Sequence, residues 1–123
     1  MKSPQLLISG LGLILADQFS KQVASGYFSV TYNPGISFGI WGNVNILVVM
    51  AVLGLVAIDA IKRGLSIFDI LIISGGLSNV IDRLSRGSII DWITVFGLWF
   101  NLADIAIAIG VLGILYNVWT KRV

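Results

Sequence analysis

The stretch from Ser74 to Asp104 places charged side chains inside a sequence that is otherwise almost continuously apolar. It holds Asp82, Asp91 and Asp104, which are half of the chain's six acidic residues. Charged groups near lipid are costly and are rarely present without a role, so carboxylates in such a setting indicate a functional site. We therefore expect this stretch to carry the chemistry and the rest of the chain to hold it in a membrane.

The composition is typical of a membrane protein, and it limits the residue types that could carry out catalysis. Of the 123 residues, 57% are hydrophobic and 11% are charged, whereas about 25% of the residues of a soluble domain are charged. The chain contains no Cys, His or Glu, which excludes thiol nucleophiles, Ser-His triads, histidine-zinc sites and glutamate acid–base pairs. Catalysis must therefore use Asp, Lys, Ser, Asn or Arg. The net charge of +2 does not indicate nucleic-acid binding.

Four apolar segments are each long enough to cross a bilayer as a helix, since about 20 residues span its hydrocarbon core. Lys2 before the first segment is also typical of a secretory signal peptide, but no cleavage site of the A-x-A kind follows it. We therefore expect a retained membrane helix. The predicted fold is an all-α integral membrane protein, one domain over residues 1–123, with transmembrane helices at about residues 5–22, 44–61, 67–84 and 100–119.

The connection from Tyr27 to Asn43 is expected to form a small extracytoplasmic β or loop element. Residues 28–32 alternate in the manner of a short strand, and the Asn-Pro-Gly that begins at Asn33 is a turn signal. A strand and turn on the membrane surface fit this pattern better than a helix. The alternative is a plain loop in which Trp41 anchors the chain at the interface.

Several charged residues have structural explanations near helix ends. Ser66 and Asp69 have the spacing of a capping box at the start of the third helix, and Asp59 is expected to be solvated or paired with a nearby Lys or Arg. Asp17 and Lys21 lie four residues apart on one helical face. These two either form a local ion pair or brace an active site.

Asp82 is predicted to be held by a salt bridge. It falls at the C-terminal end of the third helix, where the helix dipole disfavours an anion. It therefore needs a neighbouring cation, and the candidates are Arg83, Arg86 and Lys21.

Asp91 and Asp104 are the best candidates for a catalytic pair. Asp91 lies among apolar residues away from any predicted helix end, a setting that raises the pKa of a carboxyl group. Asp104 either completes a capping box with Asn101 or acts as a carboxylate favoured by the helix dipole. Two close carboxylates share one proton, so one takes a proton from water while the other polarises a carbonyl, as in aspartic proteases. The amides of Asn79 and Asn101 would stabilise the oxyanion.

The basic residues predict the orientation in the membrane. Five fall on one side and three on the other, and four of the five lie tightly against helix ends, which by the positive-inside rule makes both termini cytoplasmic. The acidic candidates then share the extracytoplasmic side. The two groups are Lys2, Lys62, Arg63, Lys121 and Arg122 inside, and Lys21, Arg83 and Arg86 outside.

Five short segments occur in an order that is much more specific than any one of them. They are Asp17-Gln-Phe-Ser-Lys21, Asn33-Pro-Gly-Ile-Ser-Phe-Gly39, Gly75-Gly-Leu-Ser-Asn79-Val-Ile-Asp82-Arg83, Gly87-Ser-Ile-Ile-Asp91-Trp92 and Phe100-Asn101-Leu-Ala103-Asp104. Together they span most of the chain. In this order they resemble the lipoprotein signal peptidases, the type II signal peptidases of bacteria, which are aspartic endopeptidases with four membrane helices.

The resemblance implies an activity and a set of site residues. Asp91 and Asp104 would be the catalytic pair, and neither a metal nor another cofactor is implied. The substrate would be a prolipoprotein whose signal peptide ends before a diacylglyceryl-modified cysteine, cleaved at the outer face of the bacterial cytoplasmic membrane by a monomer surrounded by lipid. Residues supporting the site or substrate would be Asp17, Lys21, Asn33, Asn79, Asp82, Arg83 and Asn101.

The sequence departs from the family pattern at two places. The connection between the first two helices is shorter than is usual, so residues 27–42 can form only an abbreviated version of the element that clamps the substrate. Ser78 also stands before Asn79 where the family usually has Gly. That change is expected to tighten helix packing and to leave the site residues in place.

Other classes of function fit parts of the pattern. Lys21 and a nearby serine would suit a Ser-Lys protease, and Asp with Asn side chains would suit Mg²⁺ or Ca²⁺. A small proton or ion carrier would use intramembrane Asp residues spread through the depth of the membrane. A catalytically inactive, family-like binding protein would explain the shortened connection.

Overall fold

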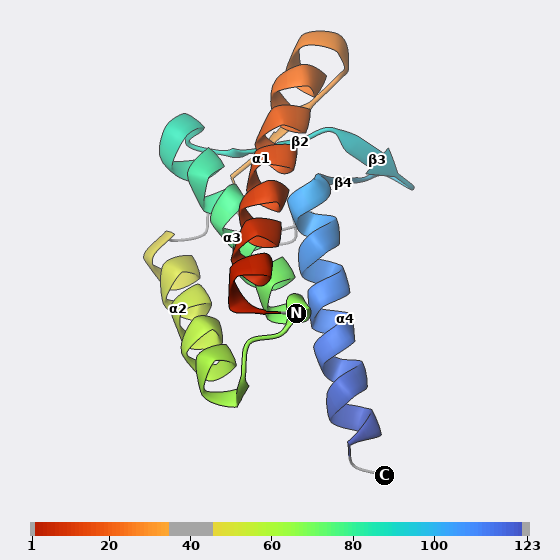
Figure 1. Cartoon of the computed structure of the whole chain (residues 1–123). Coiled ribbons are helices and arrows are strands. Elements are labelled where there is room, and N and C mark those ends of the chain that lie inside the picture. The colour runs from red at the N-terminus through yellow and green to blue at the C-terminus, as the bar shows by residue number, and fades with distance from the viewer. Residues whose placement is uncertain (1, 35–45, 122–123) are drawn as a thin grey trace.

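The computed structural model describes residues 2–34 and 46–121, which form a bundle of helices with short strands at one end (Figure 1). In this view the strands lie in the upper part of the bundle and the C-terminal end of α4 lies at the bottom. In chain order the elements are α1 (Ser3–Tyr27), β1 (Thr31–Asn33), α2 (Ile46–Arg63), α3 (Ile67–Arg86), β2 (Ile89–Asp91), β3 (Ile93–Val95), β4 (Leu98–Phe100) and α4 (Leu102–Thr120).

α3 is the central helix, because it packs against α1, α2 and α4. Its approach to α4 is close enough to require glycine. A Cβ added at Gly75 would lie 2.7 Å from the carbonyl oxygen of Ala103, and one added at Gly110 would lie 2.7 Å from that of Phe68. Small residues permit such backbone contact between membrane helices, so α3 and α4 form a firm support for the end that carries the strands.

The strands form two antiparallel pairs at that end. β1 pairs with β2, with Thr31 opposite Asp91. β3 and β4 form a hairpin in which Val95 lies opposite Leu98. The expected β element after the first helix is therefore present, and it is joined by a second one that the sequence pattern did not predict.

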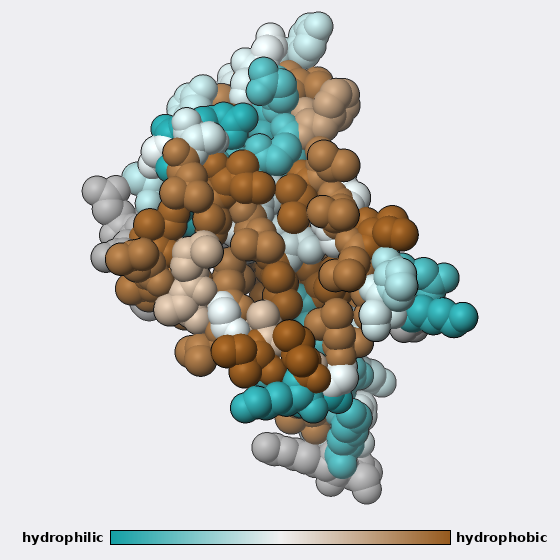
Figure 2. Space-filling model, turned by 60° about the vertical axis from the view of Figure 1, so that its left-hand side comes forward, coloured by the Kyte–Doolittle hydropathy of each residue, from teal (hydrophilic) through white to brown (hydrophobic). Residues whose placement is uncertain are grey.

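The surface is largely apolar and the interior contains several charged side chains, unlike in a typical soluble protein. Large apolar side chains face outward, such as Ile8, which is 68% exposed, and Leu112, which is 66% exposed. Asp17, Lys21 and Asp82 are fully buried. Figure 2 shows a broad hydrophobic area across the middle of one face, with hydrophilic residues gathered mainly toward its top and bottom.

One helix of the described ranges, α4, is by itself long and apolar enough to cross a membrane. The other three helices carry more charge. α1 contains a buried ion pair, and α2 and α3 carry charged residues within their length. The prediction of four membrane-crossing helices therefore remains a prediction.

The helix boundaries differ from those expected. α1 extends to Tyr27 and α3 to Arg86, so each is longer than the predicted apolar segment, and β1 begins at Thr31 instead of near Phe28. The fourth helix, expected to begin at about residue 100, begins at Leu102, because Phe100 ends β4 and Asn101 is the helix cap. Residues 44 and 45 of the predicted second helix and the proposed anchor Trp41 lie outside the described residues.

Local predictions at the helix ends are confirmed. Ser66 accepts a hydrogen bond from the backbone N–H of Asp69, and the Asp69 carboxylate accepts one from the backbone N–H of Ser66, which completes the capping box of α3. Asp59 pairs with Arg63 at the exposed end of α2, with 2.6 Å between Oδ2 and Nε.

Candidate active site

Asn101 begins α4 and fixes the position of Asp104. Its Oδ1 accepts a hydrogen bond from the backbone N–H of Asp104 at 2.9 Å, and Oδ2 of Asp104 accepts one from the backbone N–H of Asn101 at 3.2 Å. This is the capping box that the spacing predicted. Asp104 is 1% exposed and lies at the helix end whose dipole favours an anion.

β2 brings Asp91 to the same place. The Asp91 side chain is 1% exposed. Its Oδ1 accepts a hydrogen bond from Nδ2 of Asn101 at 2.8 Å, and its Oδ2 accepts one from Nδ2 of Asn33 on β1 at 3.3 Å. Asn101 therefore contacts both predicted catalytic carboxylates, one through its side-chain nitrogen and the other through its capping interaction.

Asn79 on α3 completes the polar contacts around the two carboxylates. Its Nδ2 donates to Oδ1 of Asp104 at 3.0 Å, and its Oδ1 accepts from Nδ2 of Asn101 at 3.2 Å. The same oxygen accepts a hydrogen bond from Nζ of Lys21 at 3.1 Å. The predicted carboxylates and asparagines thus form one buried network.

A fully buried ion cluster lies beneath this network. Nζ of Lys21 is 2.6 Å from Oδ2 of Asp17 and 2.9 Å from Oδ2 of Asp82, and all three side chains are fully buried. The predicted ion pair between Asp17 and Lys21 is therefore confirmed, and it extends to Asp82. Arg86 adds a second cation, with its Nη1 3.0 Å from Oδ1 of Asp82.

The two acids of this cluster each hold one element of the candidate site. Oδ1 of Asp17 accepts a hydrogen bond from the backbone N–H of Ala103 in the first turn of α4, at 2.9 Å. Oδ2 of Asp82 accepts one from the backbone N–H of Ile90 in β2, at 3.0 Å. Lys21 lies between these acids, so a single ammonium group links the helix that carries Asp104 to the strand that carries Asp91.

The remaining predicted residue, Arg83, lies close enough for its charge to interact with those of Asp82, Asp91 and Asp104.

The structure also adds two residues that were not assigned to the site. Nε2 of Gln18 donates to Oδ1 of Asp82 at 2.8 Å and to Oγ of Ser78 at 3.0 Å. Ser78 donates to Oδ2 of Asp17 at 2.6 Å. Gln18 could have been assigned to the site from the sequence, because it is a polar residue directly after Asp17 in an otherwise apolar helix.

The surroundings of Asp91 make it a weak acid. Asp91 ends β2, outside the helices. Burial and then the charge of Asp104 raise the pKa of Asp91 to about 7, and the hydrogen bonds from Asn33 and Asn101 oppose that shift. The site therefore contains a carboxyl group that can hold a proton near neutral pH, beside a second carboxyl group at a helix start.

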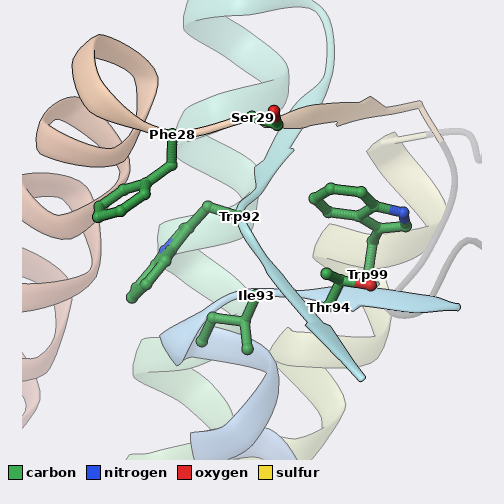
Figure 3. Close-up of a pocket in the computed structure, with 6 residues that line it drawn as sticks. All are labelled: Phe28, Ser29, Trp92, Ile93, Thr94 and Trp99. Atoms are coloured by element: carbon green, nitrogen blue, oxygen red, sulfur yellow. The ribbon is translucent and has the colours of Figure 1, made fainter. Parts of the chain in front are cut away.

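A groove of about 410 Å³ is lined in part by Trp92 and Ile93, the two residues that follow Asp91 in the chain. Figure 3 shows Phe28 and Ser29 from the chain after α1 together with Trp92, Ile93, Thr94 and Trp99. The lining is mostly aromatic or apolar. The indole Nε1 of Trp92 is buried and has no hydrogen-bond partner within the parts of the chain that the structure describes.

No group of three His, Cys, Asp or Glu side chains within residues 2–34 and 46–121 is arranged to hold a metal ion. The oxygens of Asp17 and Asp82 already face the Lys21 ammonium. The arrangement around Asp91 and Asp104 instead suits proton transfer to and from a bound water and a carbonyl group.

Comparisons with known proteins identify the family to which the chain belongs. The family model described as signal peptidase (SPase) II matches residues 10–120. A lipoprotein signal peptidase of Syntrophus aciditrophicus is 32% identical and the match covers 99% of this chain and 98% of that protein. One of Chlorobium phaeobacteroides is 36% identical, with coverage of 89% and 94%. The Syntrophus alignment extends over 158 positions, more than the 123 residues here, so that relative has additional residues.

Two solved structures share the fold. One is a bacterial membrane enzyme determined at 2.3 Å resolution, with a TM-score of 0.82, 17% identity and coverage of 98% of this chain and 90% of that one. Another, at 1.9 Å, has a TM-score of 0.74, 19% identity and coverage of 94% and 93%. With the family match over residues 10–120, these findings lead to one conclusion: the chain belongs to the signal peptidase II family of bacterial membrane enzymes, the aspartic peptidases that process lipoproteins.

Proposed function

We propose that this chain is an intramembrane endopeptidase that removes the signal peptide of a diacylglyceryl-modified prolipoprotein just before the lipidated cysteine, with Asp91 and Asp104 as the catalytic pair. The observation that carries the proposal is that Asn101 donates hydrogen bonds to both buried carboxyl groups, from Nδ2 to Asp91 and from its backbone N–H to Asp104. Family membership supports the substrate class.

In the proposed mechanism the two carboxyl groups hold one proton. Asp91 starts as the acid and Asp104 as the anion, since Asp91 has the raised pKa and the start of α4 favours a negative charge. A water between them attacks the carbonyl carbon of the scissile peptide while Asp104 takes a proton from the water. Asp91 gives its proton to the carbonyl oxygen. As the tetrahedral intermediate collapses, Asp104 gives the proton it took from water to the leaving nitrogen, and the C–N bond breaks. Asp91 takes its proton back from the hydroxyl oxygen that becomes the new carbonyl, which restores the starting state of the pair.

The surrounding residues have supporting roles in this mechanism. Asn79 and Asn101 hold the carboxyl groups in position and are near enough to stabilise developing charge. The charged cluster fixes the position of α4 relative to β2. Its members are Asp17, Lys21, Asp82 and Arg83. Asn33 orients Asp91, and the aromatic groove beside Asp91 receives apolar parts of the substrate.

We further propose that all four helices of this one domain cross the cytoplasmic membrane, with both termini inside and the strands at the extracytoplasmic side. The outward apolar side chains support this arrangement. The buried ion cluster explains how α1 and α3 carry charge without exposing it to lipid. We propose that the protein acts as a monomer in lipid and needs no cofactor.

Cleavage of a defined precursor tests the proposal. The purified protein in phosphatidylethanolamine–phosphatidylglycerol vesicles is incubated with a diacylglyceryl-modified precursor and, as the matched control, with the same precursor left unmodified. Mass spectrometry is expected to show a product that begins at the lipidated cysteine, and much slower cleavage of the control. Loss of activity with a chelator would support a metal site instead. Proton flux without cleavage would support a carrier, and binding without cleavage an inactive relative.

The pH dependence of cleavage is expected to follow the proton on Asp91. Above about pH 7, the raised pKa of Asp91, the acid loses its proton and both carboxyl groups are ionised, so kcat/KM should fall as the pH rises. Asn33→Ala removes a hydrogen bond that favours the carboxylate. The pKa of Asp91 should then rise, and the alkaline fall in kcat/KM should move to higher pH. A shift to lower pH would contradict the assignment of Asp91 as the acid.

A further inference from the structure

The β3–β4 hairpin ends in an unusually exposed apolar tip. Its two-residue turn consists of Phe96 and Gly97, flanked by the paired residues Val95 and Leu98. Phe96 is 102% exposed, and Val95 and Leu98 are 47% and 52% exposed. A tip of this composition would place a complete aromatic ring in water if the hairpin stood in solvent.

The backbone conformation of the turn is also unfavourable for a residue such as Phe96. Phe96 has a φ of +52° and Gly97 a φ of +78°. Left-handed backbone is strained for a bulky side chain and is favoured by Gly, Asn and Asp, which are the usual residues of such hairpin turns. Phe96 is therefore unfavourable both for the turn and for exposure to water. An apolar environment around the ring would remove the cost of exposing it to water.

The placement of the hairpin points to lipid as that environment. Figure 1 shows the hairpin projecting sideways from the bundle beside the start of α4. α4 is the helix that is long and apolar enough to cross a membrane, and Ile105 and Ile109 on it are exposed. The segment from Trp92 to Phe100 contains no charged residue. The tip and the outer surface of α4 are thus both apolar.

We propose that the β3–β4 hairpin is a membrane anchor whose tip, residues 95–98, inserts into the leaflet at the strand-bearing end of the bundle. Phe96 enters the acyl chains, and Trp99 lies nearer the interface, where indole rings are favoured. Lipid fits the tip better than a peptide partner does, since these side chains offer no hydrogen-bonding or charged groups to recognise one. A second copy of the chain is the competing occupant.

The anchor has a consequence for the candidate site, and this consequence rests on the proposed function. Asp91 and the aromatic groove lie at the base of the same hairpin. Insertion of the tip would hold the mouth of the groove at the lipid surface. A substrate attached to the membrane by acyl chains would then reach Asp91 without leaving the bilayer.

Single-cysteine spin labels test the anchor directly, because the chain has no Cys of its own. Phe96→Cys is labelled with a nitroxide in phosphatidylethanolamine–phosphatidylglycerol vesicles. Leu112→Cys on α4 is the lipid-facing control and Ser85→Cys, at the exposed end of α3, is the aqueous control. We expect the label at 96 to be relaxed more by oxygen than by a water-soluble nickel complex, as at 112. Relaxation like that at 85, or protection from both reagents, would overturn the anchor.

A second variant removes the anchor without harming the turn. Phe96→Asn suits the left-handed backbone and deletes the ring, so the hairpin should form at least as well. A label at Leu98→Cys should then move toward water, and KM for the lipidated precursor should rise several-fold with little change in kcat. An unchanged label depth would overturn the proposal. If the unsubstituted protein cleaves no precursor, the proposed function fails while the label depths still decide the anchor.

Discussion

Asp91→Asn and Asp104→Asn are each expected to abolish cleavage of a lipidated precursor. An amide can neither hold the shared proton nor accept one from water, so the acid–base contribution to kcat, about 10²–10⁴-fold, is lost. Single-turnover assays in vesicles, followed by mass spectrometry of the product, measure the effect. Retained activity in either variant would exclude the pair.

The control for this experiment is the same chemical change outside the site. Asp59→Asn affects a carboxylate that is exposed and pairs with Arg63 within α2. Exposed pairs contribute about 0–1 kcal/mol, so cleavage and stability should stay close to those of the unsubstituted protein. The site variants also need a check of folding, because the oxygens of Asp91 and Asp104 accept hydrogen bonds from amide groups that an introduced NH₂ would oppose. Thermal unfolding by circular dichroism provides that check.

Lys21→Met is expected to destabilise the folded protein by about 3–5 kcal/mol, the typical effect of removing one partner from a buried ion pair. The methionine nearly matches the lysine in volume but leaves Asp17 and Asp82 without their shared, fully buried cation. Unfolding in detergent with increasing denaturant measures the loss. Lys62→Met, at the exposed end of α2, is the control and should have little effect.

A double variant shows whether the loss comes from uncompensated charge. Asp17→Asn added to Lys21→Met removes one of the two carboxylates, while the amide oxygen can still accept from the backbone N–H of Ala103. Part of the lost stability should return. If Lys21→Met unfolds at the same denaturant concentration as the unsubstituted protein, the buried cluster does not stabilise the fold as we argue.

The sequence predicted best those features that depend on neighbouring residues. The capping boxes at Ser66 and Asn101 follow from spacings of three residues, and the pair of Asp17 with Lys21 follows from one helical turn. Helix lengths were underestimated because polar residues seemed to end the apolar segments. In α1 the charge of Lys21 is neutralised within the bundle, and the helix continues to Tyr27.

Contacts between residues far apart in the sequence were harder to predict. Asp82 was expected to need a cation, and three candidates remained open. The structure shows that Lys21, 61 residues earlier in the chain, and Arg86, one turn later, both contact it. The part played by Gln18 depends on the same packing of α1 against α3. The catalytic roles of Asp91 and Asp104 remain predictions, although the structure places both side chains around Asn101.

The β3–β4 hairpin was missed for a physical reason. Two-residue hairpin turns are usually marked by Asn-Gly or Asp-Gly, and here the turn is Phe-Gly within a continuous apolar segment. Such a segment gives neither the alternation of a half-buried strand nor a polar loop. Its unusual turn residue becomes informative only when the exposure of Phe96 is known.

The two roles of Asn101 would link the proposed catalytic pair to the formation of α4. This residue caps α4. It also donates to the carboxyl groups of Asp91, through its side-chain Nδ2, and of Asp104, through its backbone N–H. A chain whose last helix has not yet formed lacks the contact that brings the pair together. If Asp91 and Asp104 form the proposed catalytic pair, a chain in which α4 has not yet formed is expected to be inactive.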